Sequence, residues 1–153
     1  MQFTSSLLIS AAVSLFSLSS ATPLPTPVQD VESELWTIHA LRRICDPFDA
    51  ICTWNFQIHN NIGRYAPVPC SVPVREDKED GKSASRNHAE DFRCGPFSVS
   101  VGWSGRFGLD KGYTTLSVVD HEARLVVHPA YTDVQVVDGN MPEDQHLTPR
   151  PFY

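Results

Sequence analysis

The strongest structural signal in this chain is the stretch CTWNFQIH, Cys52–His59, in which apolar and polar residues alternate strictly. Successive side chains of a β-strand point to opposite faces, so this spacing predicts a strand with Cys52, Trp54, Phe56 and Ile58 on its buried face. Helical spacing would distribute the same four side chains around a cylinder. Each aromatic ring can bury roughly 150–250 Å², so we expect this strand at the centre of the core.

Further β segments are expected on both sides of this strand. The stretch 97–104 alternates in the same way, and shorter strands are predicted at 35–41, 113–119, 123–128 and 131–137. Prolines within 65–74 favour an edge or irregular segment there. About six to eight short strands predict an all-β single domain, either a small β-barrel or a β-sandwich stapled by two disulfides. The predicted core is Trp36, Trp54, Phe56, Ile58, Phe97, Val99, Val101 and Trp103.

Residues 1–21 have the features of a secretory signal peptide. A short apolar core diluted by serines leads to small residues around Ala21, which suit signal peptidase. The apolar run is too short to span a bilayer well, which disfavours a membrane helix. We therefore expect a secreted, extracellular protein that begins with a flexible proline-rich leader at 22–34.

Four cysteines, Cys45, Cys52, Cys70 and Cys94, follow the predicted signal peptide. An even number in a secreted chain favours two disulfides over a metal site, and three pairings are open. Among them we predict Cys45–Cys52, because its short turn-rich loop can bring the two ends together. The second pair is then Cys70–Cys94, which encloses the charged segment 75–91.

The β domain is expected to span 35–140. Within it, 75–91 is highly charged and predicts a mobile loop, read as a solvated insertion in preference to an acidic docking arm. The pair Arg42-Arg43 is read as the solvated end of the first strand, the alternative being a processing site. The polar, proline-containing segment 141–153 predicts a flexible C-terminal tail.

Two short motifs come near to catalytic signatures. In Gly102-Trp103-Ser104-Gly105-Arg106, arginine replaces the last glycine of the nucleophile elbow Gly-x-Ser-x-Gly, and no helix is expected to follow. In Asp120-His121-Glu122, the side chains of adjacent residues point apart, so the acids and the imidazole form no ready dyad. Neither motif therefore predicts a catalytic residue.

Metal and carboxylate sites have equally little support in the sequence. The six histidines show no ligand spacing; they are His39, His59, His88, His121, His128 and His146. A glycosidase would need two carboxylates that pair in space, but no spacing selects a pair among Asp46, Asp49, Asp110 and Asp133. We predict no catalytic, cofactor-binding or metal-binding residues, and no cofactor.

The order of aromatic and cysteine residues resembles a known family. The sequence LWTI at 35–38, the alternating strand Cys52–Ile58, then Cys70 and the FRCG segment at 92–95 are similar to small secreted cysteine-containing proteins of filamentous fungi. Within that group the chain most resembles the hypersensitive-response-inducing elicitors of plant-pathogenic fungi. More distantly it is similar to the major allergen of Alternaria-type moulds. The resemblance implies a compact secreted β-barrel or sandwich that works outside the fungal cell.

The leading functional hypothesis is an apoplastic effector or elicitor that recognises a host plant surface component and is not an enzyme. The alternatives are a small secreted hydrolase of cell-wall carbohydrate and a protein of the spore or wall surface. The net charge of −6, without a basic patch, disfavours nucleic acid and membranes as partners. The oligomeric state stays open between a monomer and a homodimer.

Overall fold

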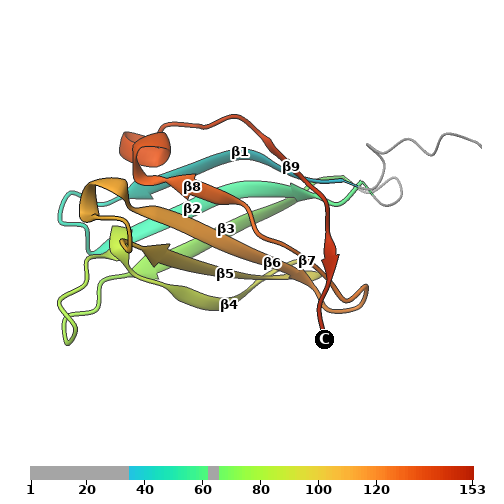
Figure 1. The fold of residues 1–153 in the computed structure, drawn as a ribbon, viewed down its shortest axis with the longest axis horizontal. Helices are drawn as coiled ribbons and strands as arrows, with labels where there is room; N and C mark the ends of the chain where they lie inside the picture. The colour runs from blue at the N-terminus through green and yellow to red at the C-terminus, as the bar shows by residue number, and fades with distance from the viewer. Residues whose placement is uncertain (1–34, 62–65) are drawn as a thin grey trace, which may run out of the picture.

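The computed structural model describes residues 35–61 and 66–153, and these form two antiparallel β-sheets that face each other across one core (Figure 1). The first sheet has the order β3-β2-β1-β9. Its strands are β1 (Trp36–Cys45), β2 (Ile51–His59), β3 (Val68–Arg75) and β9 (Gln145–Leu147). The chain is therefore all-β, as predicted, and the two sheets do not close into a barrel.

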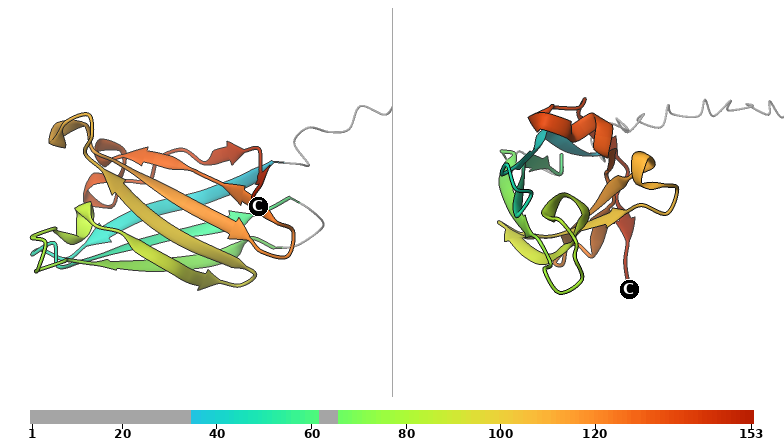
Figure 2. Two further views of the ribbon diagram at one scale, coloured as in Figure 1. Left: turned by 60° about the horizontal axis from the view of Figure 1, so that its bottom comes forward. Right: turned by 90° about the vertical axis from the view of Figure 1, so that its left-hand side faces the viewer.

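The second sheet has the order β10-β7-β6-β5-β4, and β8 pairs with β6 beside this path. Its strands are β4 (Ala89–Cys94), β5 (Phe97–Ser104), β6 (Tyr113–Asp120), β7 (Leu125–Val127), β8 (Ala130–Thr132) and β10 (Arg150–Pro151). Within residues 35–61 and 66–153, three short 3-10 helices lie between strands: η2 (Ala84–Arg86), η3 (Leu109–Lys111) and η4 (Asp133–Gly139). Both views in Figure 2 show the sheets wrapped around a shared interior.

The core confirms the inward face of Cys52–His59. Cys52, Trp54, Phe56 and Ile58 are each at most 4% exposed. The ring of Trp36 meets that of Phe97 edge-on across the two sheets, with centroids 5.3 Å apart. Of the eight predicted core residues, seven are buried. The eighth, Trp103, is only half-buried, because it lies at the end of β5 where a polar cluster replaces the core.

The prediction that Arg42-Arg43 forms the solvated end of the first strand was wrong, because β1 contains a β-bulge. The register passes from His39 opposite Gln57 to Arg42 opposite Asn55, so two residues of β1 face one of β2. Ala40 adopts a φ of 50° at this point. The extra residue reverses which face later side chains point to. The pair Arg42-Arg43 therefore does not end the strand: it lies inside β1, and Arg43 is buried at 8% exposure.

The two disulfides are Cys45–Cys52 and Cys70–Cys94, as predicted. The first joins directly paired residues of β1 and β2, whereas the second joins β3 of one sheet to β4 of the other. The prolines of β3 also fit their expected edge position. Pro69 and Pro73 lie four residues apart, so their missing N–H groups face the same side, away from the β2 ladder.

Three segments differ from the structure that the sequence predicted. The predicted strand 131–137 ends at Thr132, after which η4 begins, with the Thr132 N–H donating to Oε1 of Gln135. The predicted mobile loop 75–91 includes η2, and Ala84 within it is buried. The predicted flexible tail 141–153 instead contributes β9 and β10, one to each sheet. The tail pairs with exposed strand edges, a contact that its polar composition does not reveal.

The predicted signal peptide 1–21 and leader 22–34 lie outside the described residues. In the part of the chain that the structure describes, no helix has the length and apolar character needed to cross a membrane.

Candidate recognition surface

Exposed apolar side chains gather at one end of the sandwich, formed by the segments 44–51, 76–86, 105–112 and 133–139. We call these segments the loop end; they lie at the left in Figure 1. Seven of the nine large hydrophobic residues found exposed among the described residues belong to it, so apolar exposure is concentrated there. They are Ile44, Phe48, Ile51, Phe107, Leu109, Val134 and Val137.

The hairpin loop that presents Phe48 is held by the carboxylate of Asp46. This carboxylate accepts hydrogen bonds from the backbone N–H groups of Ala50 and Ile51, both at 2.7 Å, and of Phe48 at 3.2 Å. The N–H of Ile51, followed by those of Phe48 and Ala50, keeps the pKa of Asp46 below its ordinary value. The Phe48 ring, 88% exposed, therefore sits on a fixed turn rather than on a loose loop.

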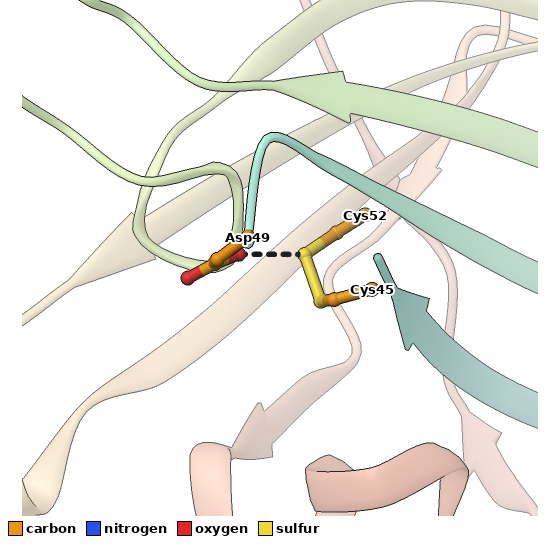
Figure 3. Close-up of side chains that lie close together, drawn as sticks. All are labelled: Cys45, Asp49 and Cys52. Atoms are coloured by element: carbon orange, nitrogen blue, oxygen red, sulfur yellow. Dashed lines mark hydrogen bonds between the residues drawn. A yellow bond between two sulfur atoms is a disulfide. The ribbon is translucent and has the colours of Figure 1, made fainter. Parts of the chain in front are cut away.

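Asp49 connects this hairpin to the neighbouring 76–86 segment. Its carboxylate accepts hydrogen bonds from the backbone N–H and the hydroxyl of Ser85, at 2.8 and 2.5 Å. Its Oδ1 also lies 3.2 Å from the sulfur of Cys52 (Figure 3). Cys45, Asp49 and Cys52 thus form a compact cluster of potential metal ligands. Both sulfurs are spent in the disulfide, so no thiolate is available to bind an ion.

A partly buried ion pair connects the strands and loops of the loop end. The guanidinium of Arg43 donates to Oδ1 of Asp133 at 2.9 Å and to the carbonyl of Ser85 at 3.3 Å. It also lies over the ring of Trp54, 5.6 Å from its centroid. The other oxygen of Asp133 accepts the indole N–H of Trp103 at 2.9 Å. One carboxylate on η4 thereby joins β1 to β5, and both of its oxygens have donors of the same chain.

A cleft of about 710 Å³ opens above this network, between β1 and η4. Its walls include Arg42, Ile44, Pro47 and Val137, of which Ile44 and Val137 are 53% and 43% exposed. The cleft is thus an open depression with exposed apolar side chains in its lining and Arg42 beside them. Such a surface can bury apolar groups of a partner around a few polar contacts.

The residues considered for catalysis do not meet in one site. The Ser104 hydroxyl accepts the N–H of Arg106 at 3.4 Å, within a turn. The carboxylate of Asp120 accepts two backbone N–H groups, of Glu122 and Ala123, and so closes the β6–β7 turn. His121 shares a hydrogen bond with Ser98 at 2.9 Å, but the Ser98 side chain is 5% exposed. A substrate carbonyl would therefore have poor access to this hydroxyl.

Sequence reasoning treated Arg43 as a solvated residue and Asp133 as one of several scattered carboxylates. Their contact joins residues 90 positions apart, and it depends on the bulge that turns Arg43 inward. All four scattered carboxylates belong to the loop end, and three of them, Asp46, Asp49 and Asp133, accept hydrogen bonds there from donors of their own chain. The signal that could have revealed this surface is the presence of large apolar residues, such as Phe48 and Phe107, in segments predicted as loops.

Fold and loop end together define a small disulfide-bonded β-sandwich protein with an ordered apolar surface. The model of the Effector TSP1 family matches residues 37–151. The curated protein Effector TSP1 of Hypocrea virens (strain Gv29-8 / FGSC 10586) is 35% identical over 130 residues, which cover 83% of this chain and 84% of the relative. The chain therefore belongs to the Effector TSP1 family of small fungal effectors. These matches do not concern the mould allergen, and that similarity stays a prediction.

Proposed function

We propose that the protein is a secreted fungal effector that acts in the plant apoplast by binding a host surface component and inducing a defence response. Membership of an effector family supports the general role. Two disulfides suit an oxidising extracellular environment. The binding would require no nucleophile, because recognition through a surface depends on shape and burial.

The observation that carries this proposal is the concentration of exposed apolar side chains at the loop end. Phe48 and Val134 are 88% and 73% exposed, and the turns beneath them are held by hydrogen bonds. A preordered apolar surface binds a partner at a lower entropic cost than a loop that must first become ordered. Exposed aromatic residues are also frequent hot spots of protein interfaces.

The test compares Phe48→Ser with a matched control, Met141→Ser. Met141 is a 52% exposed apolar residue outside the loop end, so both substitutions should leave the folded structure intact. We expect Phe48→Ser to weaken binding to leaf apoplastic extract and to leaf surface by about tenfold or more, and to reduce the leaf response in parallel. The control should retain both.

Equal activity of the two variants would contradict the proposed surface. A loss of activity in Ser104→Ala, His121→Ala or His128→Ala, with the circular dichroism spectrum unchanged, would instead favour the hydrolase alternative. Analytical ultracentrifugation of the Phe48→Ser and Met141→Ser variants would reveal whether the loop end binds a second copy of the chain. In that case Phe48→Ser would shift a dimer to the monomer.

A further inference from the structure

Three histidines that are far apart in the sequence share the outer face of the first sheet. In the central strand β1, Thr37 pairs with His59 of β2 on one side and with His146 of β9 on the other. Directly paired residues of adjacent strands project to the same face. His39 follows Thr37 by two positions and shares that face as well. Figure 1 shows β2, β1 and β9 side by side in this order.

Thr37 forms the floor of this group, which we call the histidine face: Thr37, His39, His59, Asp144 and His146. Although Thr37 points away from the core, it is only 2% exposed. Its hydroxyl shares a hydrogen bond with Nδ1 of His146 at 3.0 Å. The rings of His39 and His59 lie near each other, with centroids 5.9 Å apart and an angle of 33° between their planes.

This ring separation is close to what a shared metal ion requires. Imidazole nitrogens bind Zn²⁺ at about 2.0–2.1 Å, which places the centroids of two rings on a tetrahedral ion roughly 5 Å apart. His39 and His59 therefore need only a small adjustment of their side-chain torsions. Among the described residues, the ligand atoms of the three histidines do not yet converge, and Nδ1 of His146 is engaged by Thr37, so ligation requires the rings to turn. His39 and His59 are partly exposed and His146 is exposed, which leaves room for this movement.

The partner of His39 fixes its metal-binding nitrogen. Nδ1 of His39 lies 2.7 Å from Oδ2 of Asp144, and because a carboxylate only accepts, Nδ1 carries the proton. The lone pair is then on Nε2. The other oxygen of Asp144 accepts the backbone N–H of Ala40 at 3.0 Å, which orients the carboxylate. A carboxylate that orients a histidine in this way is the usual support of a metal-binding imidazole.

We propose that the histidine face binds one transition-metal ion of the class that prefers imidazole, namely Zn²⁺, Ni²⁺ or Cu²⁺, through His39, His59 and His146. Three neutral imidazoles suit these ions better than Ca²⁺ or Mg²⁺, which prefer oxygen ligands. Asp144 serves as a positioning residue and adds a negative charge beside the cation. Water or a ligand from the surroundings takes the remaining coordination position.

The test is calorimetric titration of the purified protein with ZnCl₂ and NiCl₂ at neutral pH. We expect saturation at one ion per chain. His39→Ala, His59→Ala and His146→Ala should each lower the affinity at least tenfold, by removing a ligand. The matched control is His128→Ala, which removes an exposed histidine of the second sheet that pairs with Ser117, and it should bind as the unaltered chain does. Absence of saturable binding, or equal binding by all four variants, would overturn the proposal.

A separate measurement is needed to show that Asp144 orients His39 and does not itself bind the metal ion. In Asp144→Ala we expect Cu²⁺ to keep the electron paramagnetic resonance pattern of bound imidazoles while its affinity falls about 10–100-fold. An unchanged affinity would contradict the positioning role. Thermal unfolding without metal serves as the folding control, and His→Gln variants replace any alanine variant that unfolds.

Affinity should also fall as the pH decreases through about 6.5, where free imidazoles become protonated and lose the lone pair. The groups that face the site are His39 on β1, His59 on β2, and Glu143, Asp144 and His146 on the C-terminal segment. The lowered pKa of Asp144 keeps this carboxylate charged over this range, so the histidines dominate the decrease. Binding that is independent of pH between 5 and 7.5 would contradict imidazole ligation.

Discussion

The two halves of β1 serve different surfaces of the protein. Before the bulge, His39 points outward to the histidine face, whereas after it Arg43 points inward to support the loop end. At the loop end the carboxylates of Asp46, Asp49 and Asp133 are paired within the chain, and apolar side chains are left exposed. On the histidine face the apolar side chains are buried beneath the sheet and imidazole nitrogens remain at the surface. One inserted residue thus lets a single strand form two surfaces of opposite chemistry.

Phe56→Ala should have the largest effect, because it damages both surfaces together. Phe56 is 4% exposed and occupies the position of β2 that faces the two-residue bulge. Removing a well-packed aromatic ring from a core costs about 3–5 kcal/mol in the free energy of unfolding. Urea denaturation measures this change. A decrease below about 1 kcal/mol would mean that the ring packs poorly against the bulge.

The two disulfides should contribute differently to stability, because one joins the two sheets and the other lies within the hairpin at the loop end. Replacing Cys70 and Cys94 by alanine frees a loop of 24 residues' separation, and the chain-entropy estimate for its closure is about 3.5 kcal/mol. Replacing Cys45 and Cys52 frees a separation of 7, worth about 2.5 kcal/mol by the same estimate. Thermal unfolding of the two double variants measures the order. The reverse order would show that the hairpin disulfide also stabilises the sheets.

Arg43→Ala and Arg42→Ala form a matched pair that tests the bulge directly. Arg43 is 8% exposed, and its loss would leave the partly buried carboxylate of Asp133 without its cation. We expect a decrease of about 2–3 kcal/mol in the free energy of unfolding, below the range for fully buried pairs because Asp133 is 27% exposed. Arg42→Ala should change stability by less than about 0.5 kcal/mol. Equal effects in urea denaturation would contradict the inward position of Arg43.

Asp144 should give a small, pH-dependent contribution on the histidine face. The hydrogen bond from His39, followed by that from the backbone of Ala40, lowers the pKa of Asp144 below 3.8. A lowered pKa in the folded state stabilises the protein above the unfolded value and loses this contribution as the pH falls through the folded value. Asp144→Asn should therefore be less stable than the unaltered chain at pH 5–7, by less than about 1 kcal/mol because the pair is exposed. The difference should vanish in acid, and a difference that grows toward low pH would have the wrong sign.

The sequence alone determined the fold class, the inward face of β2, the edge position of β3 and both disulfides. These features depend on local signals: alternation with a period of two, prolines that lack an N–H group, and the short separation of Cys45 from Cys52. The alternation and the prolines are each read from a few neighbouring residues, and the short separation of Cys45 from Cys52 makes that loop easy to close. Neighbouring residues are enough to specify each of these signals.

Only the tertiary structure decided the two surfaces. The bulge at Ala40 depends on how β1 fits against β2, and it alone turns Arg43 toward Asp133. His146 lies on the same face as His39 and His59 because a segment that reads as a polar tail pairs with the free backbone edge of β1. Contacts between residues about 100 positions apart, such as His39 with Asp144, depend on sheet register rather than on spacing in the chain. Register is set by the packing of the whole core, so no local stretch of this sequence contains it.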